Sequence, residues 1–152
     1  MPAEAHELSQ FRQKVWDTTY RGIYPDEIID DFDYGFHDER NLLWINSEEF
    51  SVYFILAGGE KAGYLIMQEK ETPYVQSLYL LESFRGKGIG KKVFGFIKDY
   101  CRRKGKKRFY LCCHPQNEKA LGFYDAMGGV ITERDEGHEN NRENSVKIEF
   151  EL

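Results

Sequence analysis

The chain has little cysteine and no long apolar run, and each shortage excludes a class of protein. Its three cysteines among 152 residues, Cys101, Cys112 and Cys113, form no CxxC pair. We therefore expect neither a disulfide framework nor a bound metal. No apolar stretch approaches the roughly 18 residues that span a bilayer, and residues 1–7 lack the basic start and apolar run of a secretory signal. These features predict a cytoplasmic protein with no membrane partner.

The length and composition suit one globular unit. A chain of 152 residues is long enough to bury one substantial core but hardly two. Hydrophobic residues make up 41% of the sequence and aromatic residues 15%, which is too much apolar material for a disordered protein. No repeat, low-complexity tract or long linker divides the sequence, so we expect residues 1–152 to form a single domain.

The charge is unevenly distributed along the chain. The formal net charge is −5, but residues 85–108 contain eleven Lys or Arg and one acid, and the remainder carries −15. A generic nucleic-acid binder is more often basic overall. The distribution instead favours a cationic patch for a small polyanion. A nucleic-acid module built on residues 85–108 is the weaker alternative, and we expect no nucleic-acid partner.

Apolar spacing indicates the order of the secondary structure. Leu8, Phe11, Val15 and Trp16 share one helical face, and Pro25 suits the first turn of a second helix. The patterns predict helices over residues 8–19, from Pro25 onward, 88–104 and 117–127, and strands over 50–57, 62–68, 74–81, 108–113, 130–133 and 145–152.

The helix over residues 88–104 lies between two apolar strands, 74–81 and 108–113. This order predicts a right-handed βαβ unit in which the two strands are parallel. The neighbouring hairpins make the whole sheet mixed. We therefore expect an α/β fold, or α+β by some conventions.

A glycine-rich loop, Arg85-Gly86-Lys87-Gly88-Ile89-Gly90-Lys91-Lys92, joins a predicted strand to a predicted helix. Glycines let the backbone approach a ligand closely, and the helix N-terminus adds partial positive charge, so the loop suits a phosphate or pyrophosphate. A tight turn with solvated lysines is the alternative. The spacing fits neither the P-loop nor the dinucleotide-binding fingerprint, so it supports neither an ATPase nor a dehydrogenase.

Two motifs in this order resemble those of the GNAT superfamily of acetyl-CoA-dependent N-acetyltransferases. Arg85–Gly90 matches the pattern Arg/Gln-x-x-Gly-x-Gly/Ala, and Asn117–Gly128 is similar to N-x-x-A-x-x-F-Y-x-x-x-G. The resemblance implies a mixed central sheet flanked by helices. It also implies an acyltransferase that moves an acetyl group from acetyl-CoA to a primary amine, by direct attack in a ternary complex. The acceptor would be a small cationic amine or a protein or peptide amine.

The resemblance also assigns roles to residues. Leu80 would offer its backbone amide to the thioester oxygen, and Asn117 would lie near pantetheine. Tyr124 would be the general acid that protonates the departing thiolate, and a core aromatic residue is the alternative interpretation of that position. The pyrophosphate would be held by the loop residues Arg85, Gly86, Lys87, Gly88, Ile89, Gly90 and Lys91.

The general base is poorly defined in this sequence. Many members of the superfamily carry a glutamate about four residues before Leu80, where this chain has Gln76. Glu82 and His114 are the substitutes, although a histidine before a proline at a strand end is as often a turn residue that bonds to backbone. The missing glutamate leaves open a second function, a non-catalytic acyl-CoA sensor or adaptor on the same fold.

The acceptor side is expected near the N-terminus, because the first two helices of the superfamily line that side of the groove. Acids there alternate with aromatic residues, which would suit a cationic amine, but a solvated acidic surface is an equal alternative. The acids are Asp26, Glu27, Asp30, Asp31, Asp33, Asp38 and Glu39, and the aromatic residues are Tyr20, Tyr24, Phe32, Tyr34 and Phe36.

The N-terminus departs from the superfamily pattern. Members normally begin with a strand just before the first helix, whereas Met1–Leu8 looks like only the end of that pattern. We expect the sheet to lack its usual first strand. The unpaired edge would then be capped, shortened or used in a homodimer.

Overall fold

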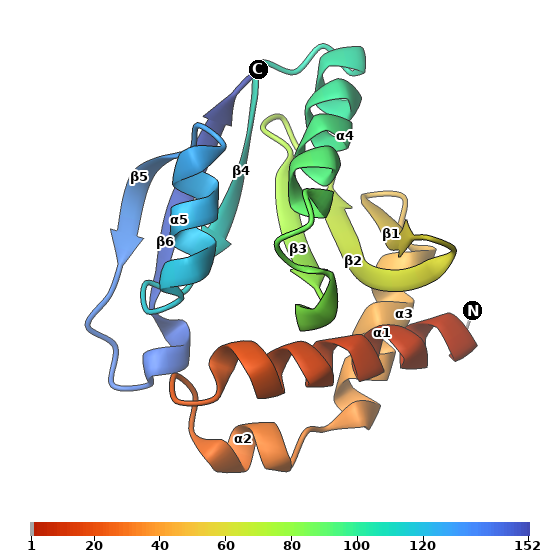
Figure 1. Ribbon diagram of the computed structural model, residues 1–152, viewed down its shortest axis with the longest axis vertical. Coiled ribbons are helices and arrows are strands. Elements are labelled where there is room, and N and C mark those ends of the chain that lie inside the picture. Colours follow the sequence, from red (N-terminus) through yellow and green to blue (C-terminus); the bar gives the residue numbers. More distant parts are fainter. Residues whose placement is uncertain (1) are drawn as a thin grey trace.

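The computed structural model describes residues 2–152, and its centre is a six-stranded mixed sheet in the order β1-β2-β3-β4-β6-β5 (Figure 1). The strands are β1 (Phe50–Ala57), β2 (Glu60–Gln68), β3 (Tyr74–Leu80), β4 (Arg108–Cys113), β5 (Val130–Asp135) and β6 (Ser145–Glu151). The helices are α1 (Pro2–Val15), α2 (Asp26–Asp30), α3 (Tyr34–Asn46), α4 (Ile89–Arg103) and α5 (Glu118–Ala126). Short turns of other helix types are η1 (Trp16–Tyr20), η2 (Glu82–Phe84) and η3 (Asn141–Glu143).

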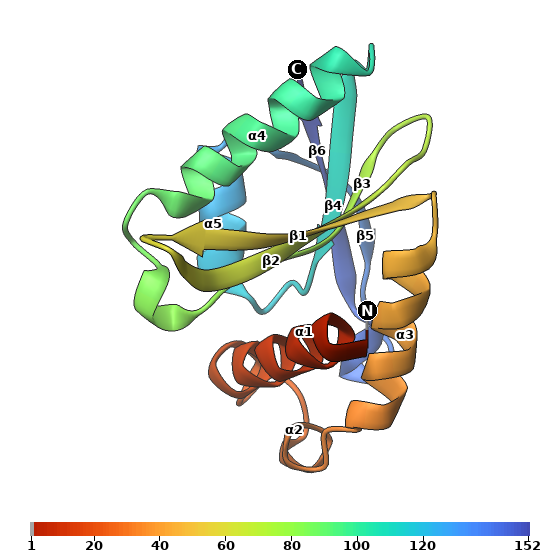
Figure 2. The ribbon, with the colours of Figure 1, turned by 90° about the vertical axis from the view of Figure 1, so that its right-hand side faces the viewer.

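Helices cover both faces of the sheet, and strand β2 shows this most directly. Leu65 and Met67 belong to the apolar cluster under α4 and α5, whereas Tyr64 and Ile66 pack with residues of α1 and α3. Successive side chains of a strand point to opposite faces, so α4 and α5 lie on one face and α1 and α3 on the other (Figure 2). The expected mixed α/β class is confirmed.

Most of the expected elements are present, but two helices differ. The first helix begins at Pro2, six residues earlier than expected, and changes to a π-helical turn over Trp16–Tyr20. Helix α3 was missed by the sequence patterns. Its start is marked by Asp33, whose side chain accepts a hydrogen bond from the Phe36 amide at 2.9 Å, as an N-cap does.

The sheet begins at β1, and no strand precedes α1 within the residues described. Residues 2–15 form a helix instead, while Met1 lies outside the described part of the chain. Within residues 2–152, the only partner of β1 is β2, so β1 is an edge strand. None of the helices in this range is long and apolar enough to cross a membrane.

The parallel strands β3 and β4 are joined over only a short distance. They pair at Tyr74↔Tyr110 and Val75↔Leu111, and nowhere further along β3. At the next residue, Gln76, β3 also carries a bulge against β2, because Ser77 pairs with Ile66 while Val75 pairs with Met67. A bulge bends its strand, so β3 turns away from β4 and the two strands diverge toward α1 (Figure 1).

Two glycine substitutions test this packing. A Cβ atom on Gly63 of β2 would lie 1.9 Å from the Tyr79 carbonyl oxygen of β3, so Gly63→Ala should lower the free energy of unfolding by about 1–3 kcal/mol. Gly95 lies in helix α4, where a Cβ atom would have no neighbour within 4 Å. Gly95→Ala should therefore raise that free energy by about 0.5–1 kcal/mol. Urea denaturation measures both, and equal effects of the two variants would contradict the close β2–β3 approach.

Candidate active site

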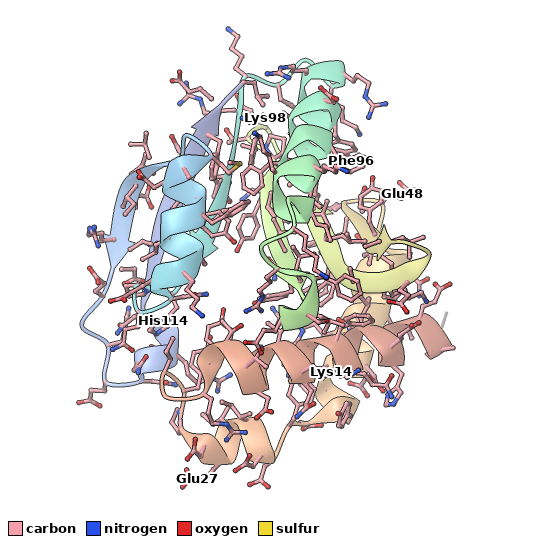
Figure 3. All side chains as sticks on the ribbon, in the orientation of Figure 1. Lys14, Glu27, Glu48, Phe96, Lys98 and His114 are labelled. Carbon is pink, nitrogen blue, oxygen red and sulfur yellow. The ribbon has the colours of Figure 1, made fainter. Side chains whose placement is uncertain are left out.

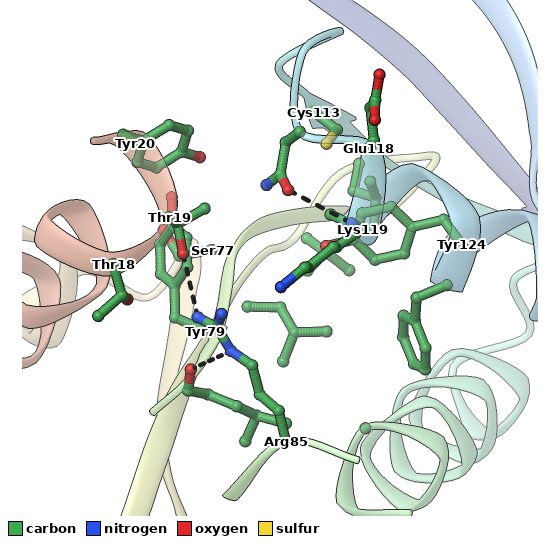
Figure 4. Close-up of a pocket in the computed structure, with 18 of the residues that line it drawn as sticks. Thr18, Thr19, Tyr20, Ser77, Tyr79, Arg85, Cys113, Glu118, Lys119 and Tyr124 are labelled. Atoms are coloured by element: carbon green, nitrogen blue, oxygen red, sulfur yellow. Dashed lines mark hydrogen bonds between the residues drawn. The ribbon is translucent and has the colours of Figure 1, made fainter. Parts of the chain in front are cut away.

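The divergence of β3 and β4 leaves a cavity of about 670 Å³. Five parts of the chain meet around it: η1 with the turn after it, β3, the glycine loop, the end of β4, and the first turns of α5 (Figure 4). The residues that line it include Thr18, Thr19, Tyr20, Ile23, Ser77, Leu80, Glu82, Arg85, Gly86, Gly88, Gly90, Lys91, Cys113, Gln116, Asn117, Glu118, Lys119 and Tyr124.

Two positions of the loop require glycine, for different physical reasons. Gly88 is the N-cap of α4 and has φ of +79°, a left-handed conformation that side chains rarely adopt. Gly90 lies in the first turn of α4, where a Cβ atom would come within 2.9 Å of the Phe123 ring of α5. The loop is therefore shaped by turn geometry and by helix packing at once, and both bring the N-terminus of α4 to the cavity.

The Arg85 side chain spans the cavity wall and does not reach outward from the loop. Its Nε donates to the Leu80 carbonyl oxygen at 3.0 Å, and its Nη2 donates to Thr19 Oγ1 at 3.1 Å (Figure 4). The sequence analysis placed Arg85 at the pyrophosphate and gave its side chain no separate role. Arg85 thus ties the glycine loop to the end of β3 and to η1.

The backbone amide of Leu80 is directed toward the cavity. The Leu81 amide donates to the Ala62 carbonyl of β2 at 2.8 Å, and neighbouring residues of a strand point their backbone groups to opposite edges. The Leu80 amide and carbonyl therefore point away from β2, toward the side that β4 has left. Since Arg85 occupies the carbonyl, the amide is the group that remains for a ligand.

Tyr124 lies both in the core and at the cavity. Its ring packs in the core beside Phe94 and Phe150, with centroids 6.0 and 6.3 Å away, and the same residue lines the cavity. Burial raises the pKa of its hydroxyl well above the usual range, and Cys113 and Tyr79 nearby raise it further. The hydroxyl therefore stays protonated at neutral pH. Asn117, also at the cavity, is the N-cap of α5 and accepts from the Ala120 amide at 3.4 Å.

A family model described as the acetyltransferase (GNAT) family matches residues 10–128, which is well over half of the chain. The chain belongs to the acetyltransferase (GNAT) family. The matched range includes η1, the glycine loop, β3, β4 and α5, which are the elements that surround the cavity.

Individual relatives and solved structures agree with this assignment. The chain is 33% identical over 85 residues to an uncharacterized N-acetyltransferase in the pepI 3' region of Lactobacillus delbrueckii subsp. lactis, covering 50% of this chain and 49% of that protein. It is 30% identical over 64 residues to the thialysine N-epsilon-acetyltransferase of Mus musculus, covering 42% and 38%. The chain thus spans about half or less of the length of these curated relatives.

The fold resembles that of the PaiA N-acetyltransferase from Thermoplasma acidophilum, whose crystal structure is a complex with coenzyme A. The TM-score is 0.77 at 19% sequence identity, and the match covers 98% of this chain and 94% of that one. At this identity the likeness concerns the fold.

The seven acids that the sequence pattern placed beside an acceptor do not lie at the cavity. None of them lines the cavity, where the carboxylates are Glu82 and Glu118. Arg21 binds Asp26 and Asp30, together with Asp17, and Glu27 points away into solvent (Figure 3). These acids are therefore paired on the surface or exposed to solvent, and they do not form the acidic rim that the sequence pattern suggested.

On the η1 side of the cavity the structure instead has a pair of tyrosines. Tyr20 lines the cavity and stacks on Tyr24 with ring centroids 4.3 Å apart and planes 4° apart. Burial raises the pKa of Tyr24 to about 12 and raises that of Tyr20 as well. Both hydroxyls are neutral at pH 7, so this wall offers hydrogen bonds and apolar surface without charge.

His114 has both ring nitrogens engaged. Nδ1 lies 3.1 Å from the Gln116 amide, which donates to it, and Nε2 lies 2.8 Å and 2.7 Å from the carbonyl and side-chain oxygens of Asn141. The residue is buried. It therefore fits the turn interpretation, and Glu82, exposed on η2, is the substitute base that does line the cavity.

Sequence reasoning missed several lining residues. Thr18, Thr19 and Ile23 come from the end of the first helix and the turn after it, and Gln116 and Lys119 flank Asn117. The α5 motif could have suggested the last two, whereas nothing in the sequence pattern distinguishes the first three. No group of three or more His, Cys, Asp or Glu residues in the described chain is placed to hold a metal ion.

The aromatic cluster behind Tyr20 should make stability depend on pH through His37. This buried ring stacks on Phe32 at 4.3 Å, and burial, with the charges of Arg12 and Arg40, lowers its pKa from 6.5 to about 4. Between these pH values the unfolded chain binds a proton that the folded protein does not, so stability falls as the pH drops through 6.5. The loss should be about 2 kcal/mol at pH 5 relative to pH 7.5.

The variant His37→Phe keeps the aromatic packing and removes this titration. Urea denaturation of both proteins at pH 7.5 and pH 5 should show a smaller loss in the variant by that amount. The same pH dependence in the variant and the wild-type protein would contradict the neutral, buried His37.

Proposed function

We propose that this protein is an acetyl-CoA-dependent N-acetyltransferase that moves an acetyl group to a primary amine, by direct attack while both substrates are bound. The observation that carries the proposal is one cavity that joins the glycine loop, the free edge of β3 and Tyr124. The first suits a pyrophosphate, the second a thioester carbonyl and the third a leaving thiolate. Together they match the groups that acetyl-CoA would bring to one site.

The phosphate end of acetyl-CoA would lie at the glycine loop. Backbone amides of residues 86–90, at the N-terminus of the 15-residue helix α4, would donate to the pyrophosphate. The Arg85 amide of the expected set is already used, since it donates to the Glu82 carbonyl at 3.1 Å. Lys87 and Lys91 would add charge. Arg85 and Lys119 both line the cavity, from the glycine loop and from α5 (Figure 4), so it has cationic side chains from two elements. The structure of the Thermoplasma acidophilum protein with coenzyme A supports this ligand class.

The transfer itself would use a backbone group and a phenol. The amine nitrogen attacks the thioester carbon, and its C–N bond forms as the carbonyl oxygen gains negative charge. The Leu80 amide donates to that oxygen, as in a backbone oxyanion site. The intermediate then collapses with cleavage of the C–S bond, and Tyr124 gives its proton to the coenzyme A thiolate. The proton that the attacking nitrogen loses passes through water and restores the Tyr124 hydroxyl.

The acceptor would enter past Tyr20 and Ile23, on the η1 side of the cavity. An amine must be neutral to attack, and a lysine-like amine has a pKa near 10.4. Glu82, one of the two carboxylates that line the cavity, is the candidate base, acting directly or through water. The mouse relative is named for acetylation of a small amine, thialysine, which supports a primary amine as acceptor.

Ligand binding gives the first test. Acetyl-CoA at about 100 times its dissociation constant should stabilise the fold by about 2.7 kcal/mol, which raises the melting temperature by roughly 5–10 °C. NAD and ATP serve as controls and should give no shift. No shift with millimolar acetyl-CoA would contradict the proposal. A shift without thiol release across an amine panel would instead favour a non-catalytic acyl-CoA sensor.

The role of Tyr124 has its own test. Tyr124→Phe keeps the ring in the core and removes the acid, so kcat should fall by roughly 100-fold while the affinity for acetyl-CoA stays unchanged. Tyr110→Phe is the matched control, because the Tyr110 hydroxyl bonds Lys70 outside the cavity. Thiol release measures kcat for both variants. Wild-type turnover in Tyr124→Phe would remove this residue from the mechanism.

A further inference from the structure

Tyr20 and Ile23 form the part of the cavity wall past which the amine would enter, here called the acceptor wall. A segment that is distant in the sequence forms a hydrogen bond to this wall. The Nδ2 atom of Asn141, in η3 between β5 and β6, donates to the Ile23 carbonyl oxygen at 2.7 Å. Ile23 lines the cavity in the turn after η1. We propose that Asn141 is a positioning residue that fixes the acceptor wall and so sets the affinity for the amine. This inference rests on the proposed function.

The turn that Asn141 holds is also bonded within itself. The Ile23 and Tyr24 amides both donate to the Tyr20 carbonyl, at 2.9 and 2.8 Å, which closes the turn on itself. Gly22 within it has φ of +89°. The turn is thus internally bonded, and the Asn141 bond to Ile23 connects it to the strand end at His114.

The anchor on the other side is His114, at the end of β4 (Figure 3). Its Nδ1 accepts from the Gln116 amide, so the ring proton is on Nε2, which donates to the Asn141 carbonyl and side-chain oxygens. That bond fixes which way the Asn141 amide points. Its oxygen is used by His114, and its nitrogen is left to donate to Ile23.

The chemistry of the asparagine side chain is therefore required at both ends. An acceptor atom is needed for His114 and a donor for the Ile23 carbonyl, and one amide supplies both. The neighbouring Arg142 also contacts this region, since its guanidinium lies 5.7 Å from the Trp16 ring and 5.4 Å from the Tyr24 ring. These contacts are behind the wall, whereas Asn141 bonds a residue that lines the cavity.

Loss of the Asn141 bond should loosen one wall only. Asn141 makes no bond to the phosphate-binding loop or to Leu80, which are joined to each other and to η1 through Arg85. The affinity for acetyl-CoA should therefore stay the same, while the amine binds a wall that is less well ordered. A single hydrogen bond of this kind is consistent with a change of about 3- to 10-fold in the KM for the amine.

The experiment compares three variants of the full chain. Asn141→Ala removes the side-chain bonds to Ile23, His114 and Gln116, whereas Asn141→Asp keeps an acceptor for His114 but has no donor for Ile23. Asn140→Ala is the matched control, because Asn140 bonds only the Arg142 amide among the contacts of its side chain. The readouts are the KM for the best amine of the panel, kcat, the affinity for acetyl-CoA, and hydrogen exchange at the Ile23 and Tyr24 amides.

Asn141→Ala and Asn141→Asp should both raise the amine KM and the exchange rates at Ile23 and Tyr24, with kcat and acetyl-CoA affinity unchanged. Asn140→Ala should match the wild-type protein. The inference is overturned if Asn141→Ala matches Asn140→Ala, or if acetyl-CoA affinity falls together with that for the amine. If the wild-type protein acetylates no amine, the proposed function fails, whereas unchanged exchange in the variants would overturn the positioning role itself.

Discussion

The cavity exists because β3 leaves β4 after only two paired positions. A parallel pair that continued to Leu80 would close the sheet and bury its edge amides in a ladder. The bulge at Gln76 bends β3 at the point where the pairing ends. The same divergence leaves room for a ligand of extended shape and leaves the Leu80 amide to donate to it. Both the binding and the chemical features of the site therefore depend on one interruption of sheet pairing.

Several residues of the site serve the fold and the site at once. Gly90 allows α4 to pack against Phe123, Asn117 caps α5, and Tyr124 packs beside Phe94. Arg85 joins the glycine loop to the end of β3 and to η1. Such residues cannot shift without moving their helix, so the groups that face the cavity are held in place before a ligand arrives. Preorganisation of this kind is what gives backbone donors their value in catalysis.

The basic and the acidic segments of the sequence differ in whether they reach the cavity. The basic segment does reach the cavity, through Arg85 and Lys91. The acids near the N-terminus do not, because Arg21 gathers Asp26 and Asp30 on the surface and Asp33 caps α3. The cavity beside η1 has the neutral Tyr20 hydroxyl, and the carboxylates that line the cavity are Glu82 and Glu118. Under the proposed function, selectivity for the amine would depend on shape and hydrogen bonds more than on a cluster of negative charge.

The sequence by itself determined the family, the order of most elements and the glycine loop, because turn glycines, apolar spacing and the α5 motif are local patterns. It missed α3, whose start rests on the Asp33 side chain, and it could not place Ile23 or Asn141. These two lie 118 residues apart and meet through one hydrogen bond. Tertiary structure alone decided the acceptor wall, since contacts between distant segments follow from packing on the sheet and leave no periodic signal in the chain.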